Sequence, residues 1–134
     1  MFKIHEFSSA PGADNELSAV YLRVVDGELE IVSEDGAWVL PDTAIHAVLS
    51  RFGAPFDDEA TIGTVAEFEL PGPAGEHARL RHVRHLAGYD VIARDYIVYE
   101  SPTSEALCAM SATVAAALLH LGRANGSRAD RNTV

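Results

Sequence analysis

The sequence predicts a two-layer α+β domain, in which an antiparallel sheet of six or seven strands carries two helices on one face. Two segments of the chain, residues 17–53 and 62–122, are each predicted to form three strands followed by a helix. We call this arrangement a βββα unit. Each predicted helix has a proline at its start and a glycine after its end, the usual asymmetry of helix termini. We therefore expect a single domain over residues 1–122 and a disordered tail over residues 123–134.

Two Asp-Gly pairs define the strands of the first unit. Asp26-Gly27 and Asp35-Gly36 each lie between apolar runs. Asp-Gly readily adopts the positive φ angles of a two-residue type I′ hairpin turn. These turns predict a meander of three antiparallel strands.

Pairing about these turns predicts which side chains are buried. The first turn places Leu22 opposite Ile31, and the second places Ile31 opposite Leu40 and Ser33 opposite Trp38. One face of the sheet is thereby apolar throughout, because side chains alternate between the faces of a strand. We expect Leu22, Val24, Leu29, Ile31 and Leu40 inside, and Arg23, Glu28 and Glu30 outside.

The first helix is expected to follow Pro41, with Asp42 as its N-cap and Gly53 after its end. Trp38 is expected in the core beneath this helix, since it shares a face with Leu40. The apolar stripe of the helix consists of Ile45, Val48, Leu49 and Phe52.

Three longer strands are predicted in the second unit, over residues 62–70, 78–86 and 91–99. Phe68 opposite Leu80 fixes the first pairing, and it also places Glu69 opposite Arg79 and Glu67 opposite Arg81. A three-residue turn at 87–89 then places Asp95 opposite Arg81. The result is a predicted charge ladder across the sheet, made of Glu67, Arg81 and Asp95.

The last helix is expected to begin with Ser101 as N-cap and Pro102 at its first position. Cys108 within it is interpreted as a small buried hydrophobe. A second, alanine-rich face with Leu119 favours a homodimer seam. The core-facing stripe consists of Leu107, Met110, Val114, Leu118 and Leu121.

The predicted register of the second unit puts His82, Arg84 and Arg94 on the apolar face with Leu80. Since an uncompensated buried charge is costly, this hairpin either projects beyond the helix or forms the wall of a polar pocket. The candidate ligand- or partner-binding residues are His82, Arg84, His85 and Arg94. A deep cavity at this place would favour a small-molecule enzyme or ligand-binding protein, and a flat or convex tip would favour a protein-binding module.

No metal or cofactor site is predicted. The acidic run Asp57-Asp58-Glu59 lacks the alternating ligands and glycine of a calcium loop. On a strand, His82 and His85 point to opposite faces, and His77 lies about 26 Å from His85. A single cysteine excludes an internal disulfide and a Cys-rich zinc site.

Charge and hydropathy narrow the function classes. The chain has 134 residues and a net charge of −10, distributed as −12 over residues 1–76 and +2 over residues 77–134. The acidic half disfavours nucleic acids and membranes and favours basic partners. No segment reads as a signal peptide or a membrane span, so we expect a cytoplasmic protein. Nine arginines against one lysine, with abundant alanine, suggest a bacterial source.

No nucleophile elbow, phosphate-binding loop, dinucleotide fingerprint or zinc-protease motif occurs in the sequence. The order of elements over residues 17–122 is similar to that of bacterial type III secretion chaperones and their non-secretory relatives, which are small, acidic and commonly dimeric. Residues 1–16, with Pro11 and Gly12, do not form the N-terminal helix of that family.

The function predicted is a non-enzymatic protein-binding module of a bacterial cytoplasm, of the chaperone, immunity or regulatory adaptor type. It is expected to be a homodimer with a protein partner, and to use no catalytic residue and no cofactor. The alternative is a small-molecule enzyme or ligand-binding protein that holds an anionic ligand near the 82–94 hairpin. Nucleic-acid binding through the same hairpin is the weakest reading, because the rest of the domain is acidic.

Overall fold

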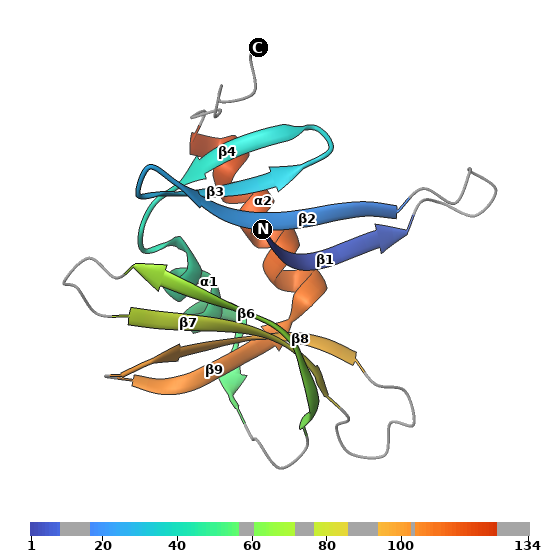
Figure 1. Cartoon of the computed structure of the whole chain (residues 1–134), viewed down its shortest axis with the longest axis vertical. Helices are drawn as coiled ribbons and strands as arrows, with labels where there is room; N and C mark the ends of the chain where they lie inside the picture. The colour runs from blue at the N-terminus through green and yellow to red at the C-terminus, as the bar shows by residue number, and fades with distance from the viewer. Residues whose placement is uncertain (9–16, 57–60, 72–76, 86–93, 103, 126–134) are drawn as a thin grey trace.

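The computed structural model describes residues 1–8, 17–56, 61–71, 77–85, 94–102 and 104–125. They form an α+β fold with two antiparallel sheets and two helices (Figure 1). The first sheet has the order β1-β2-β3-β4, with β1 (Phe2–Ser8), β2 (Leu17–Val25), β3 (Glu28–Ser33) and β4 (Gly36–Leu40). The second has the order β5-β9-β8-β7-β6, with β5 (Ala54–Pro55), β6 (Thr61–Pro71), β7 (His77–His85), β8 (Arg94–Ser101) and β9 (Ser104–Met110).

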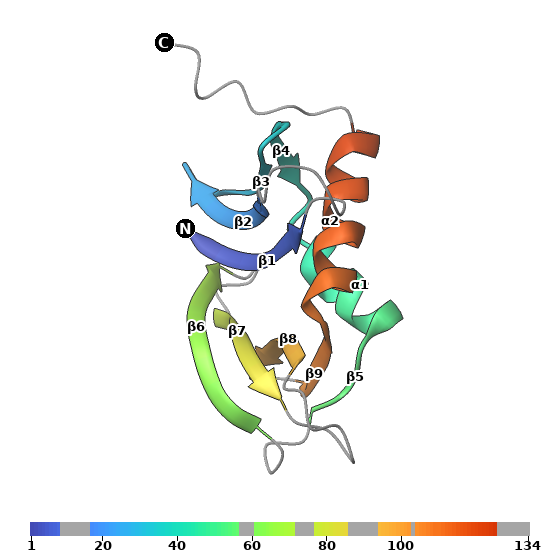
Figure 2. The ribbon, with the colours of Figure 1, turned by 90° about the vertical axis from the view of Figure 1, so that its right-hand side faces the viewer.

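The α+β class and the antiparallel pairing are confirmed, but the single sheet of two βββα units is wrong. The structure has sheets of four and five strands. Helices α1 (Ala44–Phe52) and α2 (Ser111–Asn125) lie on the same side of the molecule, and α2 contacts strands of both sheets (Figure 2). None of the described helices is long and apolar enough to cross a membrane.

The first hairpin forms as predicted. Leu22 pairs with Ile31, and Asp26 and Gly27 have φ angles of 52° and 79°, which fits a type I′ turn. The pairing of β3 with β4 is shifted by two residues, with Ile31 opposite Trp38. A shift of two leaves every side chain on its face, so Leu29, Ile31 and Leu40 are still buried.

Two of the predicted burial states in this sheet are wrong, and the prediction of Arg23 outside holds only in part, since its side chain is 15% exposed. Val24 is 37% exposed. Glu30 was expected outside, but it is completely buried and its Oε1 accepts a hydrogen bond from Arg23 Nε at 2.8 Å. A carboxylate is tolerated in the interior because a charged partner stands directly opposite on β2.

Helix α1 begins at Ala44, with Thr43 rather than Asp42 as its N-cap and no side-chain cap. Ile45, Val48 and Leu49 are buried as expected, whereas Phe52 is 48% exposed. Gly53 follows the helix as expected, and a Cβ at this position would collide with the Leu49 carbonyl oxygen.

The last helix begins nine residues later than the predicted first position at Pro102, because residues 104–110 form strand β9. β9 pairs with β8, placing Leu107 opposite Tyr99 and Ala109 opposite Ile97. Residues of β9 form backbone hydrogen bonds with β8, and these bonds outweigh the helix preference of alanine. Cys108 is therefore in a strand, and burial raises the pKa of its thiol.

Trp38 lies beneath α2 and not beneath α1. Helix α2 continues through Gly122, where an added Cβ would lie 2.8 Å from Trp38 Cβ and 2.9 Å from Ile31 Cγ2. Arg123 covers the indole ring at 5.2 Å. Only a glycine allows the helix to approach the first sheet this closely.

The pairing of β6 with β7 is confirmed, including Glu67 opposite Arg81. The pairing of β7 with β8 differs from the prediction by three residues, so Asp95 stands opposite Arg84. The predicted ladder through Asp95 is therefore wrong, and Arg81 pairs with Glu100 at 2.8 Å instead. The acidic run at 57–59, the turn at 87–89 and the tail beyond residue 125 lie outside the described residues.

The buried ion pair of the first sheet gives a stability prediction. Glu30→Ala leaves the Arg23 guanidinium without this partner in a site where its side chain is 15% exposed, and we expect a loss of about 3 kcal/mol of unfolding free energy. Glu28→Ala, an exposed position in the same strand, should change stability by less than about 0.5 kcal/mol. Urea unfolding of the two variants measures the difference. Equal effects would contradict a structural role for the pair.

Candidate functional site

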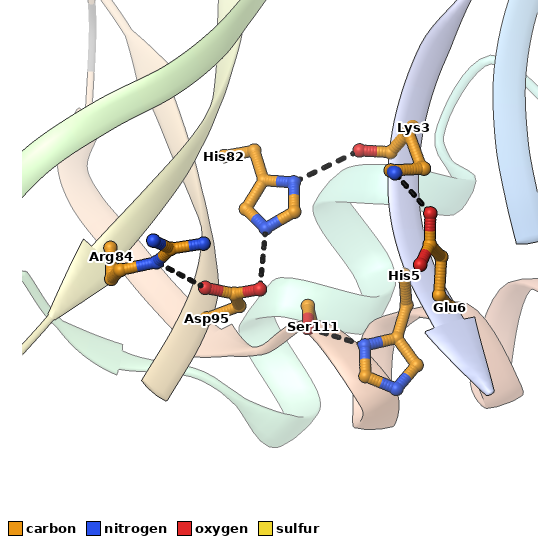
Figure 3. Close-up of polar contacts among 7 residues, drawn as sticks. All are labelled: Lys3, His5, Glu6, His82, Arg84, Asp95 and Ser111. Carbon is orange, nitrogen blue, oxygen red and sulfur yellow. Dashed lines mark hydrogen bonds and ion pairs between the residues drawn. The ribbon is translucent and has the colours of Figure 1, made fainter. Parts of the chain in front are cut away.

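The two sheets meet where β1 passes β6 and β7. The rings of Phe2 and Phe68 stack across this seam with centroids 5.5 Å apart. Beside them, His82 of β7 is 5% exposed and its Nδ1 lies 3.0 Å from the carbonyl oxygen of Lys3 (Figure 3). Since a carbonyl oxygen can only accept, Nδ1 carries the hydrogen and the ring orientation is fixed.

A β-bulge in β1 brings a second histidine to this place. Lys3 pairs with Tyr21, but His5 pairs with Val20, so Ile4 is an extra residue in the ladder. The bulge reverses the alternation of side chains beyond it. His5 is thereby on the same face as Phe2, facing the helices, instead of on the opposite face.

On that face, His5 reaches the first residue of α2. Its Nδ1 lies 2.8 Å from the hydroxyl of Ser111, which is 1% exposed. Burial lowers the pKa of His5, and the neighbouring His82 lowers it further, while Asp95 and Glu6 oppose the shift. His5 is consequently neutral near pH 7 and can accept a hydrogen bond from the serine.

Asp95 connects His82 to an arginine. Its Oδ2 lies 3.3 Å from His82 Nε2, and its Oδ1 accepts from Arg84 Nε at 3.4 Å (Figure 3). The contact with His82 is close enough for an ion pair if the ring is protonated, but its alignment does not make a hydrogen bond, and Nε2 is buried without one. Asp95 thus has two long contacts and no short one with these two residues.

These side chains border a cavity of about 410 Å³ at the seam. β1, β7, β8, β9 and the start of α2 all contribute to its lining, which consists of His5, Arg84, Arg94, Asp95, Met110, Ser111 and Ala112. Two arginines and the N-terminal end of a helix give it a positive character. Backbone N–H groups in the first turn of a helix have no partner within the helix and suit an anion.

The predicted site residues are distributed as follows. Arg84 and Arg94 line the cavity, and His82 is buried behind Asp95. His85 belongs to β7, but its side chain lies outside the described residues. The two arginines thus border a cavity, while the tip of the hairpin between them lies outside the described residues.

His5, Asp95, Met110 and Ser111 were missed as site residues. The first eight residues do alternate in part between apolar and polar types, which could have indicated an N-terminal strand carrying His5. No local signal marks the bulge at Ile4. Ser111 was expected in the middle of a helix and lies at its beginning, since the preceding residues form β9.

No protein-family model, curated protein or solved structure matches the chain. The similarity to secretion chaperones therefore rests on element order alone, and element order does not determine a function. Within the described part of the chain, no group of three or more His, Cys, Asp or Glu side chains is arranged to hold a metal ion.

The lowered pKa of His5 gives a pH prediction. As the pH falls through the ordinary histidine pKa of 6.5, His5 takes up a proton in the unfolded chain before it does so in the folded protein. The free energy of unfolding therefore decreases. His5→Gln keeps a hydrogen-bonding group near Ser111 but cannot titrate. We expect the stability of the wild type relative to this variant to fall as the pH is lowered from about 7.5 through the ordinary histidine pKa.

Thermal melts across this pH range measure the effect. The control variant is His120→Gln, which also loses a histidine, but an exposed one. A difference between wild type and His5→Gln that stays constant with pH would show that His5 titrates alike in both states.

Proposed function

We propose that the protein binds a small anionic ligand in the cavity at the seam of the two sheets. The observation that carries this proposal is the convergence of Arg84, Arg94 and the N-terminus of α2 on one cavity. The chain as a whole has a net charge of −10, so a cavity with two cations differs from the rest of the molecule. Such a local reversal of sign attracts anions and repels cations from that place.

The size and chemistry of the cavity support a small ligand. Its volume of about 410 Å³ lies in the range of small-molecule sites. A guanidinium recognises a carboxylate or phosphate through parallel N–H donors. Ser111 belongs to the lining at the helix end, and its buried hydroxyl contacts His5 Nδ1 at 2.8 Å.

The arrangement favours binding over catalysis. Ser111 and His5 form a pair of the kind used by nucleophilic enzymes, but a serine hydrolase needs a carboxylate that orients the histidine. The carboxylate that lines the cavity, Asp95, contacts His82 and Arg84. Ser111 is also almost fully buried, which restricts attack on a bound substrate.

A second candidate function, the protein-binding module, is favoured by an apolar groove between α1 and α2. The groove has a volume of about 550 Å³ and includes Phe52, which is 48% exposed, together with Ala116 and Ala117 from the alanine-rich face. Arg51 lies on its edge, over the Phe52 ring at 5.2 Å. An acidic second copy of the chain would complement this cation, which favours a homodimer.

Anion binding is tested by a double variant. Arg84→Gln with Arg94→Gln should abolish the stabilisation of the folded protein by inorganic phosphate and by acetate, because both guanidinium groups are lost from the cavity. Both arginines are exposed at the surface, so the melting temperature without ligand should stay close to the wild type.

Arg79→Gln with Arg123→Gln removes the same charge at exposed positions outside the cavity and the helix groove, and should retain the response. Thermal shift and NMR titrations give the readout. If both double variants lose the stabilisation by phosphate and acetate to the same extent, the effect comes from net charge and not from this cavity, which would contradict the proposed site.

Dimerisation through the helix groove is tested by sedimentation equilibrium. The expected mass is twice the chain mass of 14.4 kDa. Phe52→Asp should shift the protein to the monomer, because a charge in an apolar contact is strongly unfavourable. Val65→Asp, at a 55% exposed position on β6, should not. A wild type that stays monomeric at all concentrations would refute the dimer, and dissociation by Val65→Asp would place the contact at the sheet edge.

A further inference from the structure

We propose that the ligand of the seam cavity is a small zwitterion of the α-amino-acid type, with a carboxylate held by the arginines and an ammonium group held by Asp95. This inference rests on the proposed anion site and specifies its ligand. It follows from Asp95, which lines the same cavity as Arg84 and Arg94. A carboxylate inside an anion site repels a ligand that carries negative charge alone.

Asp95 retains the capacity to bind a cation. An ionised carboxylate has about four acceptor positions. Its two contacts, at 3.4 Å to Arg84 Nε and 3.3 Å to His82 Nε2, are longer than the about 2.7 to 2.9 Å of a strong charge-assisted bond. Its side chain is 36% exposed, so a ligand in the cavity can approach it.

The charges of the lining also fit a zwitterion. Arg84 and Arg94 contribute two positive charges and Asp95 one negative charge, while His5 is neutral near pH 7 because burial lowers its pKa. A carboxylate on the arginine side and an ammonium on the aspartate side give each ligand charge an opposite partner. A phosphate dianion would bring two further negative charges close to the Asp95 carboxylate and so bind less well than a zwitterion.

One side of the cavity is apolar and could contact an apolar part of the ligand. Met110 is 41% exposed and lines the cavity beside Ala112. Methionine is flexible and adapts to apolar groups of different shape. Guanidinium groups, a carboxylate and a thioether thus face one cavity, which matches the carboxylate, ammonium and aliphatic side chain of an amino acid such as leucine.

The test compares three probes of nearly the same shape: L-leucine, 4-methylpentanoate, which lacks the ammonium group, and 3-methylbutylamine, which lacks the carboxylate. Isothermal titration calorimetry and NMR shifts measure each against the full chain. We expect L-leucine to bind about tenfold more tightly than 4-methylpentanoate, since the ammonium adds one charged hydrogen bond. The amine alone should bind weakest, because two arginines repel it.

Asp95→Asn separates the contribution of the aspartate. Asparagine has the same shape and still offers an oxygen to Arg84, so the folded structure and the binding of 4-methylpentanoate should be retained. The advantage of L-leucine should disappear. As a matched control, Asp35→Asn removes an exposed acidic group outside the cavity and should preserve that advantage.

Each outcome has a distinct meaning. Equal affinities for L-leucine and 4-methylpentanoate in the wild type would overturn the zwitterion while the anion site stands. An advantage of L-leucine that survives Asp95→Asn would also overturn it, since the ammonium would then bind elsewhere. If neither carboxylate nor inorganic phosphate binds, the proposed function itself fails. Tightest binding of the amine would make the cavity a cation site and refute both.

Discussion

The hydrogen bond between buried His82 and the carbonyl oxygen of Lys3 joins the two sheets of this protein at their seam. It connects β1 to β7, and the other nitrogen of the same ring lies 3.3 Å from Asp95 at the edge of the cavity. The stacked rings of Phe2 and Phe68 close the seam beside it. The His82 ring is only 5% exposed and therefore needs a hydrogen-bond partner, so this contact favours one particular arrangement of the two sheets.

Helix α2 packs across both sheets that this hydrogen bond joins. It contacts strands of both sheets, and Gly122 in its last turns lies against Trp38 and Ile31. Its first residue, Ser111, is held by His5 at the cavity. Helix α2 therefore covers both sheets and also brings its N-terminal end to the candidate site. Packing of the core and the geometry of the cavity thus depend on the same helix.

Electrostatics distinguish the cavity from the rest of the second sheet. On the opposite face, Arg79 and Arg81 both pair with Glu100, at 2.7 and 2.8 Å. Burial alone would raise the pKa of Glu100, but the two arginines hold it below its ordinary value. Those arginines thus have a structural explanation. Arg84 and Arg94 border the cavity, and among the described residues Arg84 contacts Asp95 at 3.4 Å.

The sequence by itself determined the features that depend on neighbouring residues. Asp26-Gly27 specified a turn and its register, since few other pairs accept two positive φ angles. Opposite charges and matching apolar residues specified the pairing of β6 with β7. The apolar spacing predicted α1 and its buried residues Ile45, Val48 and Leu49, and the arginines at 84 and 94 were singled out because a buried charge requires an explanation.

Only the tertiary structure decided the features that depend on contacts between distant segments. Residues 104–110 form a strand because β8 offers an edge to pair with, and local helix preference is too weak to resist this. The bulge at Ile4 turns His5 toward α2, and the register of β8 puts Asp95 beside Arg84. His5, Asp95 and Ser111 come from three separate parts of the chain, so no local pattern could show that they meet at one cavity.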